Sequence, residues 1–424
     1  MRTLLAIPLF TFALSPAATA QAPEPVPPPE PAAAEGPLPL AAPEPSPSAL
    51  PTTAAAPAPL PAAAPVPQAT AGYKDGFFLQ SEEGAFKLKL RGLLQVRGSS
   101  TIPADAPEEW SATAAVHRAQ LEMSGHAFTK QLGFLLKTEW GQGFTFAKDA
   151  WVNYAFQPGA LELRAGLWKR PFSRQELSGD NRQEFVERGL VNSSFEAGRD
   201  IGVALHNDLD KSPALEWSVG AFAGAKDKPD VVGAVVAGDD GALALQGAKL
   251  SSVAGPLRPT LVGRVGVNFG EVKGYQEVDA EGGTPRGGVA LSVLEAVELH
   301  DEQGGTSQLE VDGILKLYGV DATAAIFFAT AQTGAGTFEQ EADALGLHAQ
   351  AGYLFLEHWH PALRYQLVQK LDGSSEQHEI AAGLSVLFFG QSVQWQSDAA
   401  ALVERAGDAL ATDVRLRTQL LLAF

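Results

Sequence analysis

The stretch that decides the fold runs from Leu161 to Val203; it begins LELRAGLW and ends RDIGV. In residues 161–168 apolar and polar side chains alternate with a period of two, which is typical of a β-strand with one apolar and one polar face. The same alternation returns in residues 201–206. The insert between them carries charges of both signs. Connections this long in a β protein are usually functional, so we expect residues 169–198 to fold into the lumen if the sheet closes into a barrel.

The composition of the 424-residue chain excludes several classes of function. The absence of cysteine rules out disulfides, a thiol nucleophile and thiolate metal sites. The formal net charge of −18 argues against nucleic acid as a partner, because phosphate backbones require clusters of Lys and Arg. After the first twenty residues, no stretch has the roughly 18 consecutive apolar residues that a membrane-spanning helix needs.

Three regions follow from changes in composition along the chain. Residues 1–20 have the charged start, short apolar core and Ala18-Thr19-Ala20 cleavage site of a secretory signal peptide. Residues 21–72 are rich in Pro and Ala, cannot bury enough apolar surface to fold, and are predicted to be a disordered periplasmic linker. From residue 73 to 424 the texture changes to short alternating segments, which we assign to a single β-barrel domain.

Sixteen alternating segments can be counted by their period of two. They are Phe86–Arg97, Val116–Phe128, Leu132–Trp140, Lys148–Phe156, Leu161–Trp168, Arg199–His206, Leu215–Gly224, Thr260–Phe269, Gly288–Leu299, Gln308–Leu317, Ala322–Thr330, Ala342–Phe355, Ala362–Gln369, Glu376–Phe388, Ser392–Leu402 and Thr412–Phe424. A weaker segment, Ala242–Leu250, is placed in a loop, because a closed barrel with both termini on one side needs an even number of strands.

Short and long connections alternate between these segments, which is typical of an outer-membrane barrel with periplasmic turns and external loops. The long connection Gly270–Arg286 breaks the rule, since it falls on the short side. Aromatic rings prefer the membrane boundary. Six phenylalanines end the strands that should descend to the periplasm: Phe128, Phe156, Phe269, Phe355, Phe388 and Phe424. The sequence therefore predicts an all-β fold, a 16-stranded antiparallel transmembrane β-barrel with an inward-folded third loop, in the outer membrane of a Gram-negative-type cell.

The alternation also predicts which charges face the lumen. A lipid-facing charge would cost about 2–4 kcal/mol at the bilayer midplane, so basic residues should point inward. Because the first and last strands must pair, Lys87, Lys89, Arg91, Arg415 and Arg417 are expected to form one basic strip. The complete set of pore-lining or anion-binding candidates is Lys87, Lys89, Arg91, Arg118, Lys137, Arg164, Arg415 and Arg417.

A basic strip in a narrow aqueous pore lowers the barrier for anions. The alternative is a neutral polar wall, in which lumenal carboxylates neutralise these groups: Glu122, Glu139, Asp149, Glu310 and Glu379. The long insert offers further candidates for the constriction: Lys169, Arg170, Arg174, Arg182, Arg188 and Arg199. Pairing with Glu176, Glu184 or Glu187 would pin the loop, and we expect a mixture in which unpaired arginines face the pore.

Several motifs in the first half of the chain are similar to the phosphate-selective porin O and P family. They are Tyr73–Leu79 with Phe86–Gly92, Arg118–Leu121 with Lys148–Tyr154, Gly166–Ser173, Phe185–Arg188 and Gly198–Val203. The resemblance covers residues 73–205 and implies a trimeric outer-membrane porin with an inward third loop. Its partners would be outer-membrane lipid, lipopolysaccharide and small anionic or hydrophilic solutes. The family's lumenal basic groups match Arg91, Arg118 and Lys137.

Other chemistry finds little support in the sequence. His358 and His360 could form a metal pair on one side of a strand, but no third ligand is placed, so we predict no metal and no cofactor. No Ser occupies a Gly-x-Ser-x-Gly turn, and we predict no catalytic residue. Three functions remain open. They are a passive porin, a surface receptor or adhesin that binds through the loop Ala225–Leu257, and a soluble secreted β protein.

Overall fold

The computed structural model describes residues 69–141, 145–195, 197–224, 230–237, 243–251, 257–296, 306–331 and 343–424. These residues lie in one compact unit that spans residues 64–424. The predicted signal peptide, and the predicted linker up to residue 68, lie outside the described residues. Residues 70–72, which the sequence assigned to the linker, form a strand with Tyr73.

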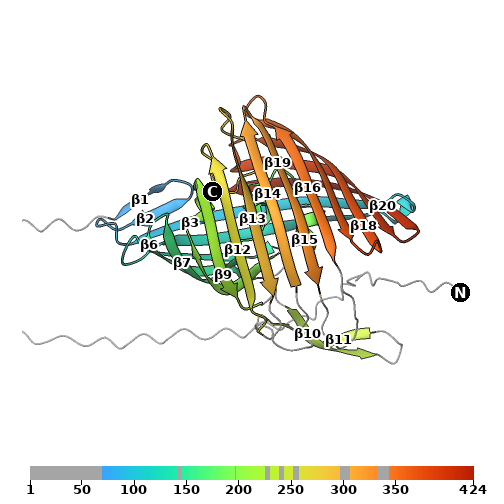
Figure 1. Cartoon of the computed structure of the whole chain (residues 1–424), viewed down its shortest axis with the longest axis horizontal. Coiled ribbons are helices and arrows are strands. Elements are labelled where there is room, and N and C mark those ends of the chain that lie inside the picture. Colours follow the sequence, from blue (N-terminus) through green and yellow to red (C-terminus); the bar gives the residue numbers. More distant parts are fainter. Residues whose placement is uncertain are drawn as a thin grey trace, which may run out of the picture. The chain divides into compact units, whose positions relative to one another are not determined.

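Sixteen antiparallel strands form a closed ring, as the alternation predicted (Figure 1). In ring order they are β3 (Lys87–Pro103), β4 (Ser111–His126), β5 (Leu132–Glu139), β6 (Phe146–Gln157), β7 (Leu161–Lys169), β8 (Arg199–His206), β9 (Leu215–Phe222), β12 (Thr260–Phe269), β13 (Arg286–Ala296), β14 (Thr306–Leu317), β15 (Val320–Ala331), β16 (Ala344–Tyr353), β17 (Trp359–Lys370), β18 (Ser375–Leu387), β19 (Val393–Ala406) and β20 (Ala409–Ala423). Pairing of β20 with β3 closes the barrel. Each predicted segment overlaps one of these strands.

Two hairpins lie outside the ring. The first, β1 (Thr70–Tyr73) and β2 (Phe77–Gln80), pairs with residues 87–90 of β3, just beyond the point where β20 ends. The second, β10 (Asp230–Ala237) and β11 (Leu243–Ser251), forms a separate two-stranded sheet. The weak segment at residues 242–250 is therefore a strand of a loop hairpin and not of the barrel, which agrees with the parity argument.

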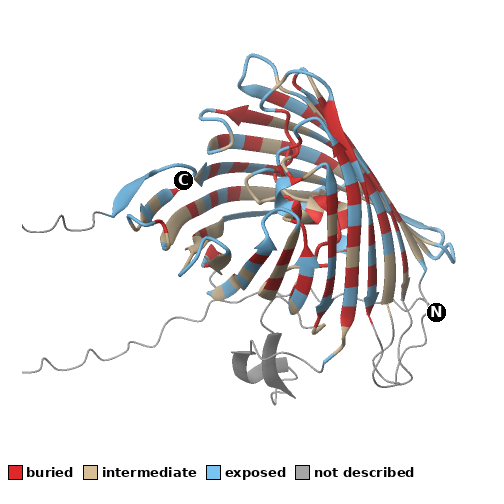
Figure 2. Ribbon diagram, turned by 60° about the vertical axis from the view of Figure 1, so that its left-hand side comes forward, coloured by how far each residue is buried: buried red, intermediate tan, exposed pale blue. Residues whose placement is uncertain are grey.

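Buried and exposed residues alternate along the strands of the barrel wall (Figure 2). On β3, Gln95 is fully buried while the side chain of the next residue, Val96, is 47% exposed. On β20 the apolar residues at even positions from 414 to 422 face outward, whereas Arg417 and Gln419 are buried. A water-soluble protein rarely exposes so continuous an apolar surface, so this surface faces lipid. The soluble secreted alternative is thereby rejected.

The six predicted boundary phenylalanines are all exposed at strand ends, as expected for rings at a membrane interface. Among the described residues, no helix has the length and apolarity required to span a bilayer. The two α-helices, α1 (Arg174–Leu177) and α2 (Leu190–Ser194), are short and belong to the connection between β7 and β8.

That connection, which we call the inner loop (residues 170–198), folds into the barrel as predicted. Its apolar side chains pack on the inner wall: Phe172 and Phe195 lie against Phe327 of β15. The barrel wall has small residues at the positions where the inner loop comes close to it. A side chain on Gly346 of β16 would collide with the Phe195 ring, and Phe185 rests on alanines of β17, β18 and β19.

A second segment also occupies the interior. The connection between β12 and β13, which we call the inner turn (residues 270–285), buries Val272, Tyr275 and Val278. Its backbone reaches the inner loop, because the amide of Glu277 donates to the carbonyl of Arg182 at 3.2 Å. This position explains why a long connection occurs at the end of the barrel that otherwise has short turns: it covers interior surface.

Candidate functional site: the barrel interior

Several arginines of the barrel wall hold the inner loop, and Arg264, Arg97 and Arg364 bind its backbone. Arg264 of β12 is completely buried and donates to the carbonyl of Phe172 at 2.8 Å and to Asp312 at 2.6 Å. These contacts tie the start of the loop to the wall. Because an unpaired buried charge is costly, the matching carboxylate on β14 is required for the guanidinium to lie here.

The other two arginines contact the centre of the loop from two different strands. Arg97 of β3 donates to the carbonyl of Val186 at 2.8 Å and to Glu187 at 3.0 Å. Arg364 of β17 donates to the carbonyl of Glu187 at 3.0 Å. The centre of the loop is therefore bonded both to β3 and to β17.

The predicted basic strip does not exist, because the register of closure separates its two halves. Arg417 pairs with Ser99 and Arg415 with Thr101, near the far end of β3 from Lys87 and Arg91. At about 3.3 Å per residue, the two groups lie roughly 25 Å or more apart along the strand. Barrel closure determines which strands are neighbours, whereas the stagger between the strands determines which residues lie side by side. The order of the strands in the sequence does not reveal this stagger.

The lumenal candidates are mostly neutralised by acids. Lys89 approaches Asp75 at 4.0 Å, Arg164 binds Asp210, Arg415 binds Glu379 and Arg417 binds Asp398. Arg118 pairs with Asp180 and Glu187, and both Arg91 and Lys137 pair with Glu122. Lys87 instead lies 5.1 Å from the centroid of the Phe78 ring.

The candidates of the loop are also paired, with one exception. Lys169 approaches Glu176, Arg170 binds Asp200, Arg174 binds Asp312, Arg188 binds Asp180 and Arg199 binds Asp149. In the part of the chain that the structure describes, the guanidinium of Arg182 forms no ion pair and no hydrogen bond, and its side chain is exposed to the lumen. The sequence analysis predicted that some loop arginines would be paired and that others would face the pore unpaired. Among the loop candidates in the described residues, Arg182 is the unpaired one.

Ion pairs in the loop lower the pKa of three of its acids, Glu176, Asp180 and Glu187. Burial alone would raise the pKa of Asp180, but Lys148, Arg118 and Arg188 hold that pKa well below its ordinary value. Asp180 accepts from Lys148 at 2.9 Å and lies 3.3 Å from Arg188. The Asp180 carboxylate therefore connects the inner loop to Lys148 of β6 and Arg118 of β4. It holds the loop in position and does not add an unpaired negative charge to the lumen.

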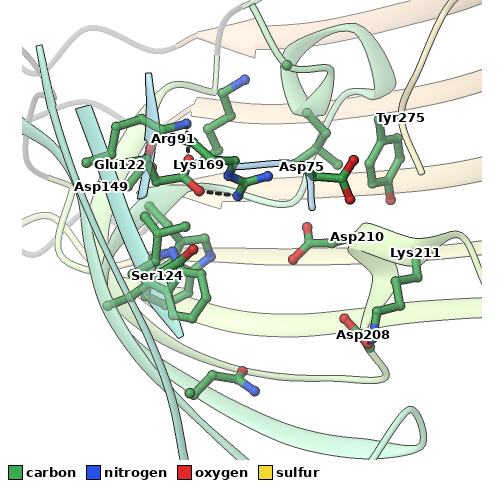
Figure 3. A pocket seen from close by; sticks show the side chains of 18 of the residues that line it. Asp75, Arg91, Glu122, Ser124, Asp149, Lys169, Asp208, Asp210, Lys211 and Tyr275 are labelled. Carbon is green, nitrogen blue, oxygen red and sulfur yellow. Dashed lines mark hydrogen bonds and ion pairs between the residues drawn. The ribbon is translucent and has the colours of Figure 1, made fainter. Parts of the chain in front are cut away.

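A cavity of about 1090 Å³ occupies the side of the lumen that the inner loop leaves open (Figure 3). Its wall is formed by β3 to β7, with Arg91, Glu122 and Asp149 on strands, and Asp208, Asp210 and Lys211 on the β8–β9 connection. Tyr275 of the inner turn and Lys169 at the root of the inner loop bound it on other sides. The cavity holds groups of both signs, as expected for a water-filled passage.

One part of the cavity has more cations than acids. Arg91 and Lys137 share the single carboxylate of Glu122, the latter at 2.8 Å. Arg182 lies near this group: its partial burial and the charge of Arg91 lower the pKa of its guanidinium, while Asp75 and Glu122 act in the opposite direction. Two cations thus pair with one carboxylate, and Arg182 lies near them together with Asp75. We call Arg91, Lys137, Arg182 and Glu122 the basic cluster.

Several interior residues escaped the sequence analysis. Arg97, Arg264 and Arg364 each stand at an inward position of a correctly predicted strand, so the alternation would have found them. The patch of β15 that Phe172 and Phe195 cover also has a signal: Ala325–Ala329 is apolar at every position, which indicates an apolar inner face as well as a lipid-facing one. The length of the loop alone could not show which wall it would contact.

An apolar belt around a closed barrel, with ionised side chains and a water-accessible cavity inside, defines the protein as an outer-membrane porin. Residues 103–282 match the model of the family described as phosphate-selective porin O and P. The match begins later and ends later than residues 73–205, where the motifs were recognised.

Solved structures with the same fold are porins and outer-membrane channels. The anion-selective porin from Comamonas acidovorans shares 13% identity, with a TM-score of 0.53 and coverage of 80% of this chain and 99% of that one. The outer-membrane channel DcaP of Acinetobacter baumannii shares 12% identity, with a TM-score of 0.55 and coverage of 82% and 99%. At these identities the likeness concerns the fold. Comparison with curated protein sequences finds no match.

Proposed function

We propose that the protein allows passive diffusion of small hydrophilic solutes, with a bias toward anions of the size of phosphate. The observation that carries the bias is the basic cluster, in which Arg91 and Lys137 share one carboxylate and Arg182 nearby is unpaired, beside the open cavity. Elsewhere in the described interior the cationic candidates other than Lys87 are matched by acids, so the bias is local and modest. One relative of the same fold is named as an anion-selective porin, which supports this reading by analogy.

Arg182 is the residue on which the bias depends most. Its guanidinium is unpaired, exposed to the lumen and carried by the loop that narrows the bore. In water, a unit charge about 8 Å from a passing ion contributes about 0.5 kcal/mol, and physiological salt screens roughly half of this. Because the effect has opposite sign for anions and cations, removal of the charge should lower the anion-to-cation permeability ratio by about two-fold.

Reversal potentials in planar bilayers under a KCl gradient test this proposal. The wild type should favour chloride, and Arg182→Gln should move the ratio toward unity without loss of conductance. Arg405→Gln removes the same charge from an exposed ion pair with Glu376 on the outer part of the barrel and serves as the matched control. Cation selectivity of the wild type, or an equal effect of both substitutions, would refute the bias.

The trimer implied by the family resemblance belongs to the same proposal. In it, part of the apolar belt would contact neighbouring protomers, and the remainder would contact lipid and lipopolysaccharide. Light scattering of the detergent-solubilised protein should give the mass of three chains. Liposome swelling with phosphate, sugars and dicarboxylates would then rank the solutes. No enzymatic role is part of this proposal.

A further inference from the structure

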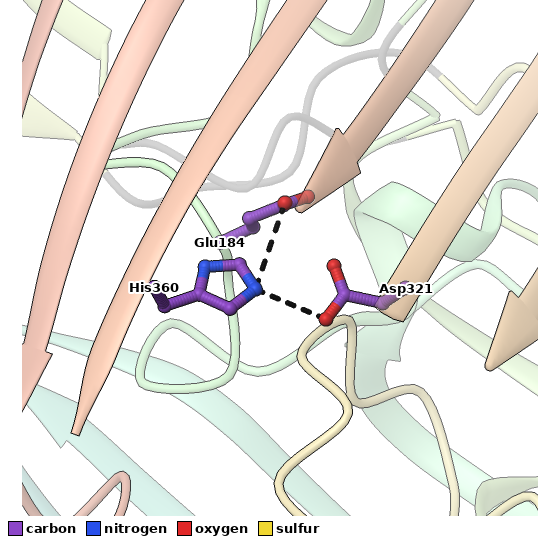
Figure 4. Close-up of side chains that lie close together, drawn as sticks. All are labelled: Glu184, Asp321 and His360. Atoms are coloured by element: carbon purple, nitrogen blue, oxygen red, sulfur yellow. Dashed lines mark hydrogen bonds and ion pairs between the residues drawn. The ribbon is translucent and has the colours of Figure 1, made fainter. Parts of the chain in front are cut away.

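Glu184, Asp321 and His360 converge inside the barrel (Figure 4). Glu184 belongs to the inner loop, Asp321 to the start of β15 and His360 to the start of β17. The Nε2 atom of His360 lies 3.0 Å from Asp321 Oδ2 and 3.8 Å from Glu184 Oε1, and one ligand atom from each residue lies within 4.8 Å of the others. The pair of His358 and His360 that the sequence analysis set aside does not form here, because His358 is exposed and its Nδ1 contacts the carbonyl of Leu387.

All three side chains are buried, and their hydrogen-bonding capacity is not used up. Each side chain is at most 1% exposed. Within the described residues, neither Glu184 Oε1 nor Asp321 Oδ1 has a hydrogen-bond partner. A buried carboxylate oxygen without a donor is costly, so these atoms need a positive ligand or a proton.

The neighbouring strand makes room for the cluster. Gly352 of β16 lies directly opposite Asp321 in the sheet. A side chain on Gly352 would overlap both Glu184 and His360, so glycine at this position leaves the space in which the loop carboxylate meets the imidazole.

The surroundings add a further carboxylate to the cluster. Glu277 of the inner turn accepts from the backbone amide of Glu184 at 2.8 Å. Apart from His360, no basic side chain in the described parts of the chain forms an ion pair with Glu184, Asp321 or Glu277. The nearby cations are engaged elsewhere: Arg364 with Glu379, and Lys316 with the carbonyl of Val278.

We propose that Glu184, Asp321 and His360 bind one divalent transition-metal ion, for which Zn²⁺ has the best-matched chemistry. Imidazole nitrogen and carboxylate oxygen are ordinary zinc ligands, and three of them leave one position for water. With zinc–ligand bonds of about 2.0–2.1 Å, ligand atoms of a tetrahedral site lie about 3.3 Å apart. The separations of 3.0 and 3.8 Å fall on either side of this value.

The ion would give the inner loop a second kind of contact with the barrel wall, in addition to the arginine contacts. Glu184 is supplied by the loop, whereas both other ligands are on strands. The backbone amide of Asp279 in the inner turn donates to Asp321 Oδ2 at 2.7 Å, which orients this ligand. One metal ion would thus connect the loop, the inner turn and two strands. This inference is independent of the proposed anion bias.

The test uses the full chain, purified from outer membranes in detergent, stripped with EDTA and dialysed. Zinc content is measured by mass spectrometry, and affinity by competition with a chromogenic chelator. The wild type should take up one Zn²⁺ per chain. Glu184→Gln, Asp321→Asn and His360→Gln should each lower the affinity by more than about 100-fold, since even loss of a residue that only supports a ligand costs 10–100-fold.

His358→Gln is the matched control, because it removes an imidazole two positions away and outside the cluster; it should retain the full zinc content. If the folded wild type takes up no zinc, or if the ligand variants bind as tightly as the control, the proposal is overturned. Cobalt substitution of the wild type needs no variant. X-ray absorption of the Co²⁺ form should show one imidazole with oxygen donors, and a spectrum of hydrated Co²⁺ would also refute the site.

Discussion

The guanidinium of Arg364 lies 4.2 Å from the centroid of the Phe185 ring, so a wall residue and a loop residue are stacked inside the barrel. The same arginine binds Glu379 and the carbonyl of Glu187. The ring also packs on alanines of three strands. Apolar packing and ionic contacts therefore act on one short part of the inner loop. A substitution in this part should alter the width of the bore and leave the barrel intact.

Phe185→Ala should release this part of the loop. Truncation of a buried Phe typically costs about 3–5 kcal/mol, and loss of a cation–π contact adds about 0.5–2 kcal/mol. We expect a higher single-channel conductance and more open-channel noise in bilayer recordings, with an unchanged barrel. Phe389→Ala, at an exposed ring on a turn, is the control. Equal conductance of wild type and Phe185→Ala would contradict a role of this contact in setting the bore.

Arg264→Leu should destabilise the folded protein. It leaves Asp312 with Arg174 as its remaining ion-pair partner and removes a donor from the carbonyl of Phe172. Breaking a buried ion pair on one side costs about 3–5 kcal/mol, whereas an exposed pair contributes about 0–1 kcal/mol. The measurement is the urea-unfolding midpoint in lipid vesicles, with Arg405→Leu as the exposed control. A midpoint shift no larger than that of the control would show that Arg264 is not an anchor.

Gly92→Ala should hinder closure of the barrel. The backbone amide of Gly92 donates to the carbonyl of Phe424 at 2.8 Å, and a side chain at position 92 would overlap the Phe424 ring. Overpacking of this kind costs about 1–3 kcal/mol, so the folded fraction on heat-modifiable gels should fall. The double variant Gly92→Ala/Phe424→Ala restores space and should fold better than the single variant. No difference between the two would exclude this steric cause.

The ion pairs of Glu187 in the inner loop predict how the conductance of the channel depends on pH. Burial alone would raise the pKa of Glu187, but Arg118, His117 and Arg97 keep that pKa well below its ordinary value. A lowered pKa gives stability that is fully present above the ordinary value of about 4.3 and is lost as pH falls through the lowered value. The contribution of Glu187 to conductance should therefore stay constant from pH 7 to about pH 4.5.

Glu187→Gln provides the comparison for this prediction. At neutral pH it should already show the noisier recordings that the wild type shows only in stronger acid. Glu82→Gln, on an exposed turn, should behave as the wild type throughout. If the difference between Glu187→Gln and the wild type disappears between pH 7 and pH 5, the carboxylate titrates in its ordinary range and the ion pairs do not hold the loop.

Much of the fold could be predicted because its cause is local. Residue-by-residue alternation on β20 placed Leu416 outside and Arg417 inside, and the same rule placed a strand at each of the sixteen positions. The inner loop was found from its length and charge. Its partners were not found: Asp312 binds both Arg174 and Arg264, although the three residues belong to three separate segments of the chain.

Sequence by itself determined the number of strands, the face on which each side chain lies and the existence of an inward loop, because period-two alternation and turn length are properties of neighbouring residues. Only the tertiary structure decided the stagger that separates Arg91 from Arg417, the acids that neutralise most lumenal cations, and the meeting of Glu184 with His360. These depend on distances between segments far apart in the chain, which are set by barrel closure and by the packing of the loop on one wall.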